Sequence, residues 1–499
     1  MSKKQKILGV YGACLAFLVL IVFCIIKELA WVPLLVPVAL ITVCLYFFAL
    51  KDVMLLIVFS APLSVNLIGT EFGISIGIPD EIMLILFTFM FIFKMCYDGK
   101  IDKDIISHPV TICIFIVLFW MFVCSITSSM PVVSFKYLAA RLWFVIPCYF
   151  VAIRIFKGDQ KNIIKYNWAY VIAFTIVIVY TIINHAMHGF SAKSGLWVMF
   201  PFFPEHTCYG AMLVFMIPFL VYYLLSSEYS LLKRLAALVL LVLFVIATYL
   251  SFTRAAWISA VVALLVALAF LLKIKFKYAV VIVACLVGLF FAFEDQILIS
   301  MQRNNNESSQ NFVDHIKSMT NISSDASNLE RINRWSCAIR MFEERPVVGW
   351  GPGTYQFVYA PFQRAREETI ISTNAGDVGN CHSEYFGPLS EQGLPGLILV
   401  FALMISIFAT GGRVYTHAKD RNDKHIVLFC MLAFVTYYTH GLMNNFLDID
   451  KAAVPFWLYV AMIVSLDIKI RNIEKQNAEG QSVDHKELDT ADSQIDSSI

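Results

Sequence analysis

The chain has 499 residues, of which 59% are hydrophobic and only 15% are charged, and its formal net charge is +2. Soluble globular domains are about 45–50% apolar and about 25% charged, so this composition excludes an ordinary water-soluble fold. The small net charge and the lack of a basic stripe with interleaved aromatic residues argue against a nucleic-acid partner. The sequence therefore predicts an all-α fold, a polytopic helix bundle within a lipid bilayer.

Apolar segments of about the length that crosses a bilayer core, ~20 residues, recur along the whole chain. The first follows a lysine-rich start and is longer than the apolar part of a signal peptide, so we expect it to be retained as a membrane helix. The third and fourth segments are short, and we therefore expect about 12–14 spans. The segments lie approximately at residues 7–26, 29–50, 53–68, 81–95, 109–128, 136–156, 166–187, 207–226, 235–252, 255–273, 278–297, 387–411, 425–442 and 453–469.

The distribution of Lys and Arg between the loops predicts the orientation of these spans. With a cytoplasmic N-terminus, the cytoplasmic loops contain basic clusters, for example in the loop after residue 153. The short loops on the opposite side contain few basic residues, namely Lys27, Lys136, Lys193, Arg254 and Lys451. Because cytoplasmic loops of membrane proteins are enriched in basic residues, we expect both the N- and the C-terminus in the cytoplasm.

Two polar stretches divide the chain. The first, at 294–386, is predicted to lie on the outer face and to contain a helix, because Leu329, Ile332, Trp335, Ile339 and Phe342 recur at helical spacing. The second, at 470–499, is rich in Asp, Ser, Gln and Glu and is predicted to be a disordered cytoplasmic tail. The expected domains are an N-terminal transmembrane bundle at 1–293, the large loop at 294–386, C-terminal transmembrane helices at 387–469 and the tail at 470–499.

Two arginines lie where a membrane protein has to stabilise a charge. Arg141 falls in the sixth predicted span, and an Arg at a helix centre costs about 2.5–3.5 kcal/mol on insertion scales. It either extends to the membrane interface or faces an anionic ligand inside the bundle. Arg254 marks the outer turn between two very apolar spans. The same two roles, interface anchor or anion ligand, remain open for it.

Further candidates lie in and near the long loop. Arg331 and Trp335 are one helical turn apart and share a face, which is either a solvated surface or part of a site. Residues 345–351, Arg-Pro-Val-Val-Gly-Trp-Gly, lack the strand and the Lys-Ser/Thr of a nucleotide-binding loop and predict only a turn. His382 could accept a proton from a hydroxyl, and His206 occupies a similar position before the eighth span, although a structural role is the alternative for both.

Metal and disulfide chemistry are weaker expectations. No Cys/His spacing indicates zinc, and we expect neither a metal nor a cofactor. The outer-loop sequence Asp448-Ile449-Asp450 leaves divalent metal binding as an alternative. Cys337 and Cys381 both fall in the long loop, where a disulfide is possible on an oxidising face but cannot be deduced from sequence.

Three motifs in a fixed order resemble the O-antigen ligase/polymerase family. They are Ser-x-Thr-Arg at 251–254, Arg-x-x-x-Trp at 331–335 followed by Arg-Pro-x-x-Gly-x-Gly at 345–351, and His-Ser-x₇-Glu-x-Gly-x-x-Gly at 382–396. Arg-Leu-Trp-Phe at 141–144 and Phe-Phe-x-x-His-Thr at 202–207 are also similar to members of this family. The resemblance covers about residues 206–446. Each motif alone is weak evidence for the family, whereas their order around a long outer loop is much more specific to it.

The resemblance implies transfer of a glycan from undecaprenyl pyrophosphate to a new hydroxyl at the periplasmic face of a bacterial inner membrane. The acceptor is lipid A-core in ligases, another glycan in polymerases, or a protein, and we favour a ligase. It implies His382 as the catalytic base and Arg254 and Arg331, with Arg141 as a third, as ligands of the pyrophosphate. His206, Glu391 and Trp335 are possible supporting residues, and Glu391 is expected to shape the start of its helix. The family's ligases are regarded as metal-independent.

A secondary transporter is the alternative from a different class, because transporters have a similar number of spans. Transporters place ionisable groups and broken helices near the middle of the membrane. In this chain few acidic residues fall within the predicted spans, and the polar residues gather outside them. The sequence therefore favours the glycan transferase over the transporter.

Overall fold

The computed structural model describes residues 50–66, 77–98, 102–272, 326–369, 372 and 379–496, with side chains from residue 329 in the loop helix and up to residue 478 in the last helix. The predicted spans at 7–26 and 278–297, and that at 29–50 apart from Leu50, lie outside the described residues. Within them, eight helical stretches are long and apolar enough to cross a membrane. These confirm the predicted all-α polytopic bundle.

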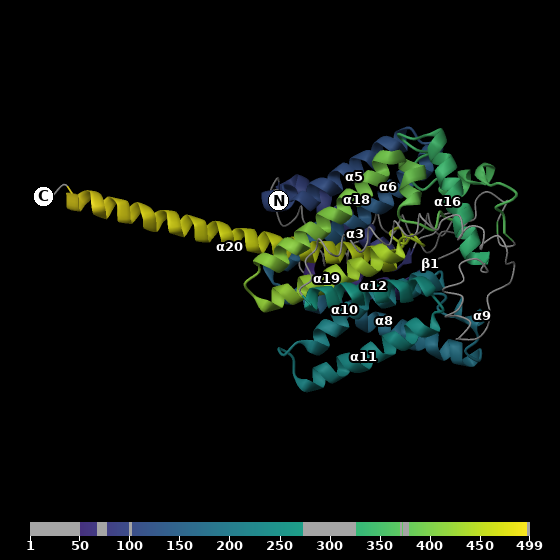
Figure 1. Cartoon of the computed structure of the whole chain (residues 1–499), viewed down its shortest axis with the longest axis horizontal. Coiled ribbons are helices and arrows are strands. Elements are labelled where there is room, and N and C mark those ends of the chain that lie inside the picture. Colours follow the sequence, from purple (N-terminus) through teal and green to yellow (C-terminus); the bar gives the residue numbers. More distant parts are fainter. Residues whose placement is uncertain are drawn as a thin grey trace, which may run out of the picture.

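The helices that form the bundle lie side by side (Figure 1). Residues 50–60 are helical and lead into η1 (Ala61–Leu63). The following helices are α3 (Asp80–Asp98), α4 (Lys103–Ile106), α5 (Pro109–Ile126), α6 (Pro131–Val145), η2 (Ile146–Val151), α7 (Ala152–Gly158), α8 (Lys161–Met187), α9 (Ala192–Gly195), α10 (His206–Leu225), α11 (Leu231–Leu250) and α12 (Arg254–Leu271). After the undescribed stretch come α16 (Ala326–Glu344), α17 (Tyr355–Val358), η3 (Ala360–Phe362), α18 (Phe386–His417), α19 (Arg421–His440) and α20 (Asp450–Asp496).

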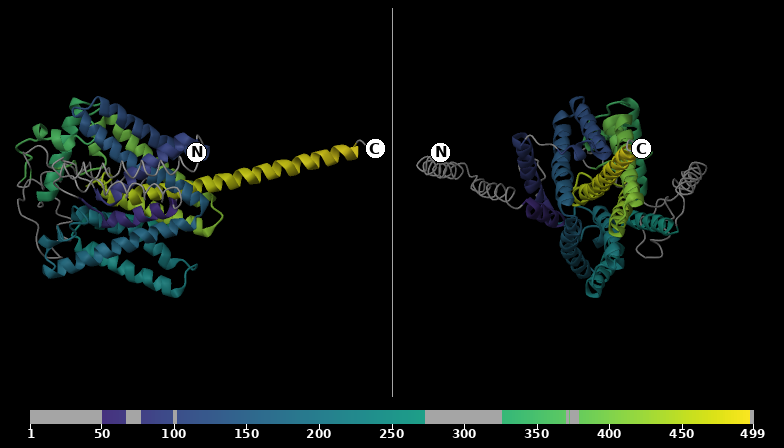
Figure 2. Two further views of the ribbon diagram at one scale, coloured as in Figure 1. Left: turned by 180° about the vertical axis from the view of Figure 1, so that it is seen from behind. Right: turned by 90° about the vertical axis from the view of Figure 1, so that its left-hand side faces the viewer.

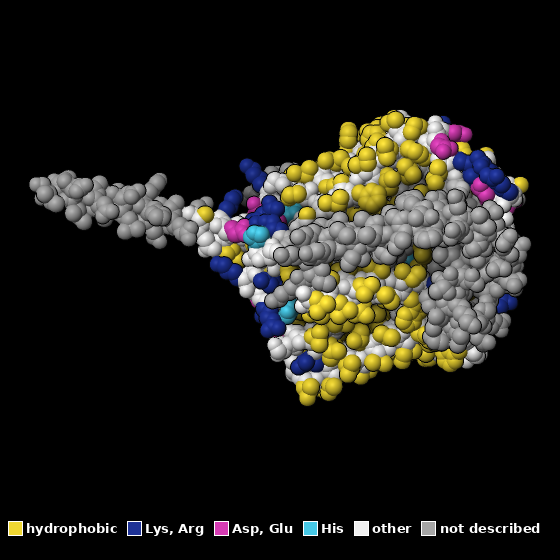
Figure 3. Space-filling model, viewed as in Figure 1, with side chains coloured by type: hydrophobic (Ala, Val, Ile, Leu, Met, Phe, Trp, Pro, Cys, Tyr) yellow, Lys and Arg dark blue, Asp and Glu magenta, His cyan; other side chains and the backbone are white. Residues whose placement is uncertain are grey.

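Burial distinguishes the centre of the bundle from its rim. The apolar part of α20 is 94% buried, whereas the corresponding parts of α11 and α12 are each 22% buried. The end-on view shows α20 among the other helices (Figure 2). Apolar side chains cover the flank of the bundle, while Lys and Arg gather at its ends (Figure 3). This arrangement suits a lipid environment, in which the outer face of a helix stays apolar.

The third predicted span is corrected by the structure. It was expected to run over 53–68, but the helix gives way to η1 at Ala61, where Pro62 lacks the N–H that a continuing helix requires. The chain then forms the antiparallel pair β1 (Val65–Asn66) and β2 (Gly77–Ile78), with Val65 opposite Ile78. The next predicted span, 81–95, corresponds to α3. This part of the chain therefore contains a short hairpin that the hydropathy pattern did not predict.

The predicted disordered tail at 470–499 is also wrong for most of its length, because α20 continues to Asp496. The helix extends away from the bundle, at the end opposite α16 (Figures 1 and 2). Helix formation is limited by its first turn, and each added residue then gains one hydrogen bond. The buried part of α20 supplies that first turn, so a polar sequence unable to start a helix alone can continue one.

Candidate functional site

Helix α16 packs against the chain segment that precedes α18, at the end of the bundle away from the C-terminus (Figure 1). The Trp335 ring stacks on Phe386 at 5.4 Å, and its Nε1 donates to the backbone carbonyl of His382 at 3.4 Å. Tyr355 OH donates to the Arg334 carbonyl at 2.8 Å. We call this end of the molecule the α16 end. These contacts fix the segment containing His382 relative to the helix that carries Arg331.

The two glycine motifs found in the sequence pack against each other. Trp350 N donates to Ser390 O at 3.1 Å, and Gly351 N donates to Glu391 O at 2.8 Å. In the other direction, Leu394 N donates to the Pro346 carbonyl at 2.9 Å. These bonds pair backbone N–H and C=O groups that lose their helical hydrogen-bond partners where α18 kinks. The turn at 345–351 and the start of α18 thus form one structural unit.

Gly393 lies at the kink of α18, with φ 70° and ψ −168°. A Cβ atom there would lie 2.2 Å from the Val347 carbonyl oxygen. Gly349, with φ +64°, faces the backbone of Glu391 in the same way, at 2.3 Å. Both positions therefore combine a left-handed backbone with a close approach of two chain segments, and only glycine meets both demands.

We expect Gly393→Ala to lower the yield of folded protein strongly, because backbone strain alone costs on the order of 1–3 kcal/mol and the clash adds to it. The measurement is the melting temperature and the monodisperse yield in detergent. Gly412→Ala is the matched control, since its Cβ would meet nothing within 4 Å in the same helix. Equal melting temperatures for the two variants would contradict the role of Gly393.

Basic and imidazole groups from three helices and from the segment before α18 lie at the α16 end. Arg331 donates through Nε to the Met443 carbonyl at 3.2 Å. Its charge acts on His206 at the start of α10 and on His382 before α18. Arg254 begins α12, and the preceding Thr253 donates through Oγ1 to the His206 carbonyl at 2.9 Å. The structure thus brings four predicted residues, His206, Arg254, Arg331 and His382, to one end of the bundle; we call them the basic group.

His382 has a constrained backbone and a shifted ionisation. Its φ is +50°, and its N–H donates to Asn380 Oδ1 at 3.0 Å. Burial lowers the pKa of His382 to about 4, and the positive charges of Arg331 and Arg334 act in the same direction. A hydrogen bond to Asn444 opposes the change. The imidazole is therefore neutral at neutral pH and able to accept a proton.

His440 belongs to the same region, although sequence analysis did not single it out. It is the last residue of α19 and is 1% exposed. Arg331 and His206 are the charged or titratable groups that act on it, and its ring packs edge-on against Phe446 at 5.2 Å. Neither ring nitrogen has a hydrogen-bond partner among the described residues. An ionisable residue within a predicted span was the available signal, since such residues are functional candidates in membranes.

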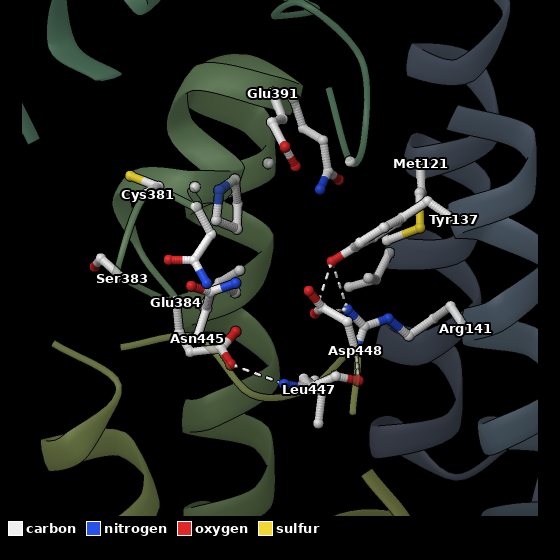
Figure 4. Close-up of a pocket in the computed structure, with 18 of the residues that line it drawn as sticks. Met121, Tyr137, Arg141, Cys381, Ser383, Glu384, Glu391, Asn445, Leu447 and Asp448 are labelled. Carbon is white, nitrogen blue, oxygen red and sulfur yellow. Dashed lines mark hydrogen bonds and ion pairs between the residues drawn. The ribbon is translucent and has the colours of Figure 1, made fainter. Parts of the chain in front are cut away.

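Arg141 and Glu391 lie elsewhere, in a cavity of about 430 Å³ between α5, α6, α18 and the start of α20. Arg141 donates to Leu447 O at 2.9 Å and to Tyr137 OH at 2.8 Å, and lies 3.6 Å from Asp448. The Glu391 carboxylate accepts from Tyr355 N at 2.9 Å. Figure 4 shows these side chains around the cavity. This contact joins the start of α17 to α18.

The segment that carries His382 lies next to the cavity and is held by hydrogen bonds of Glu384. Glu384 N donates to Gly441 O at 2.8 Å, and Glu384 Oε1 accepts from Phe446 N at 2.7 Å and Leu447 N at 3.1 Å. Burial raises the pKa of the Glu384 carboxyl. The neighbours of His382 in sequence, residues 380, 381, 383 and 384, line the cavity. The segment that carries His382 therefore borders the cavity and also contributes to the basic group.

The remaining sequence alternatives concern metals and disulfides. Asp448 pairs with Tyr137 and Arg141, whereas Asp450 pairs with Lys451 at 2.8 Å, so the two carboxylates have different partners. No group of three potential metal ligands occurs among the described residues. Cys337 and Cys381 pack in one buried cluster at the α16 end but are free thiols. The described residues of the site therefore contain neither a Cys337–Cys381 disulfide nor such a group of metal ligands.

Residues 239–401 match the model of a family described as O-antigen ligase. This part of the chain, about a third of its length, is similar to O-antigen ligases. The match includes Arg254, Arg331, Trp335, His382 and Glu391, which confirms the resemblance seen in the motifs. No curated protein matches the chain. Together with the eight apolar helices among the described residues, this similarity supports a multi-pass membrane protein of the glycan-transferring type.

Proposed function

We propose that this chain transfers a glycan from undecaprenyl pyrophosphate to an acceptor hydroxyl at the periplasmic face of a bacterial inner membrane. Lipid A-core is the favoured acceptor, with another glycan or a protein as the alternatives. Both termini lie in the cytoplasm, so that the α16 end faces the periplasm. The observation that supports the proposal is that the basic group, from three helices and the segment before α18, lies at this end.

The proposed reaction breaks the bond between the sugar's anomeric carbon and the diphosphate oxygen. The leaving diphosphate keeps the bonding electrons and gains negative charge, which guanidinium groups stabilise through paired N–H donors. We assign this role to Arg254 and Arg331. The acceptor hydroxyl oxygen bonds to the anomeric carbon and loses its proton to His382. This scheme requires neither a metal nor a cofactor.

Arg141 is assigned a different role from the sequence expectation. It shares a cavity with Glu384, Glu391 and Asp448 rather than a position in the basic group. Its hydrogen bonds to Tyr137 and Leu447 occupy both terminal nitrogens. We therefore propose that two arginines, and not three, bind the diphosphate.

We expect the acid limb of the pH profile to lie near pH 4, because only neutral His382 accepts a proton and its pKa is lowered to about 4. At pH 5.5 roughly 97% of the His382 rings would be neutral, against roughly 10% for an imidazole of ordinary pKa. The measurement is kcat/KM between pH 4.5 and 8 in reconstituted vesicles, with size-exclusion profiles as a check on folding. A tenfold loss between pH 7.5 and pH 5.5 with intact protein would contradict the assignment.

The acceptor class is tested by deleting the gene and analysing surface glycans. Loss of all long chains from lipid A-core indicates a ligase. Chains truncated to one repeat indicate a polymerase, and sugars missing from secreted proteins indicate a protein glycosyltransferase. Unchanged glycans of all three kinds would overturn the proposed function.

A further inference from the structure

The cavity that contains Arg141 differs in chemistry from the neighbouring basic group. Its volume of about 430 Å³ is typical of sites for small ligands, which range over about 300–1,000 Å³. Three carboxyl groups line it, from Glu384, Glu391 and Asp448, against the single guanidinium of Arg141. Figure 4 shows the Glu391 and Asp448 side chains directed into the same space. The guanidinium of Arg141 already lies 3.6 Å from Asp448, so the described lining residues offer no unpaired positive charge to an anionic ligand such as a diphosphate.

The guanidinium of Arg141, which is the positive charge in the cavity, already has partners within the protein. Arg141 uses one terminal nitrogen for Leu447 O and the other for Tyr137 OH, with Asp448 at 3.6 Å. By contrast, some acceptor groups remain open to a ligand. The hydrogen bonds made by the Glu384 carboxylate all go to Oε1, and the Asp448 side chain is 40% exposed. Carboxylate oxygens are strong acceptors for hydroxyl groups.

The rest of the lining suits a sugar ring. Aromatic side chains, from Tyr137, Tyr437, Phe456 and Trp457, border the cavity and offer apolar faces. The amide side chains of Gln356, Gln392 and Asn445 also line it and can both donate and accept. A few polar groups set among apolar and aromatic surface are the usual composition of a small-molecule site. A neutral saccharide has the matching combination of hydroxyl groups and C–H faces.

We propose that this cavity binds the saccharide part of the acceptor, a hydroxyl-rich and uncharged sugar, while the basic group binds the donor diphosphate. The inference rests on the proposed function and assigns its two substrates to two neighbouring regions that share the His382 segment. Residues 380, 381, 383 and 384 line the cavity, while His382 between them interacts with Arg331 and Asn444. The acceptor hydroxyl would thus approach the base from the cavity, and the diphosphate would leave on the arginine side.

The test uses the full-length chain in lipid vesicles. Donor lipid and acceptor are both purified from a strain in which the gene is deleted, because that strain retains both unreacted. We expect Asp448→Asn to raise the acceptor KM about tenfold, through loss of one charge-assisted hydrogen bond. The donor KM and the inhibition by added inorganic pyrophosphate should not change. Glu228→Gln, an exposed acidic residue at the opposite end of the bundle, is the matched control.

A second variant keeps the test decisive if Asp448→Asn folds poorly. The Gln356 side chain lines the cavity and makes no hydrogen bond to the described residues, so Gln356→Leu should fold and raise the acceptor KM about threefold. A weaker effect of pyrophosphate or a raised donor KM in these variants would overturn the inference and leave the proposed function standing. Unchanged acceptor KM in both would also overturn it. Absence of transfer by the unmodified chain would instead overturn the proposed function itself.

Discussion

Replacing His382 by Gln is expected to lower the rate of glycan transfer by about 10²–10⁴-fold, the usual contribution of a general base. Gln keeps the size and polarity of the side chain but cannot accept a proton. The backbone of this residue should persist, because its N–H bonds to Asn380 and its carbonyl to Trp335, neither of which involves the imidazole. The measurement is the initial transfer rate in vesicles at equal protein content, with the donor saturating.

His417→Gln is the control for this variant, since His417 is exposed at the opposite end of α18. Its transfer rate should match that of the unmodified chain. His382→Gln should retain both substrate KM values, because the lost interaction acts when the proton moves. If folded His382→Gln transferred glycan at the normal rate, His382 would not be the catalytic base. His440 would then be the next residue to test.

Arg331→Gln and Arg254→Gln are each expected to lower kcat by about 10²–10³-fold, the effect of removing one donor to a developing negative charge. Arg331→Lys should recover only part of this loss, since an ammonium lacks the planar pair of N–H donors. Inorganic pyrophosphate, which resembles the leaving group, should inhibit both Gln variants more weakly. Steady-state kinetics with donor lipid and pyrophosphate as inhibitor provide the measurement.

The control for the arginine variants is Arg366→Gln in the same extramembrane region. Arg366 is 75% exposed and has only a long contact, 3.8 Å, to Glu367. It should keep normal kinetics and normal inhibition by pyrophosphate. If Arg366→Gln lost as much activity as Arg331→Gln, a general effect of charge would explain the results better than a diphosphate site. Normal pyrophosphate inhibition in Arg254→Gln would exclude that residue from the site.

Packing at the α16 end explains why the motifs could be found in the sequence but not assembled from it. The turn at 345–351 and the Glu-x-Gly of α18 are local glycine patterns, visible in the chain order. Their mutual hydrogen bonds, such as that from Gly351 N to Glu391 O, join residues far apart in sequence. Hydropathy and residue spacing describe neighbours along the chain and cannot predict contacts between distant segments. The same limitation hid His440, which ends one helix and interacts with groups from two others, Arg331 and His206.

The sequence by itself determined that this is a helical membrane protein, that most of its described long helices follow apolar segments, and that its motifs resemble those of O-antigen ligases. These properties are local, because every backbone polar group in a bilayer must be satisfied within its own helix and long apolar runs therefore become spans. Only the tertiary structure decided that Arg331 and His382 share one compartment while Arg141 lies in another. That separation depends on which helix ends meet, and side-chain packing between distant segments fixes those meetings.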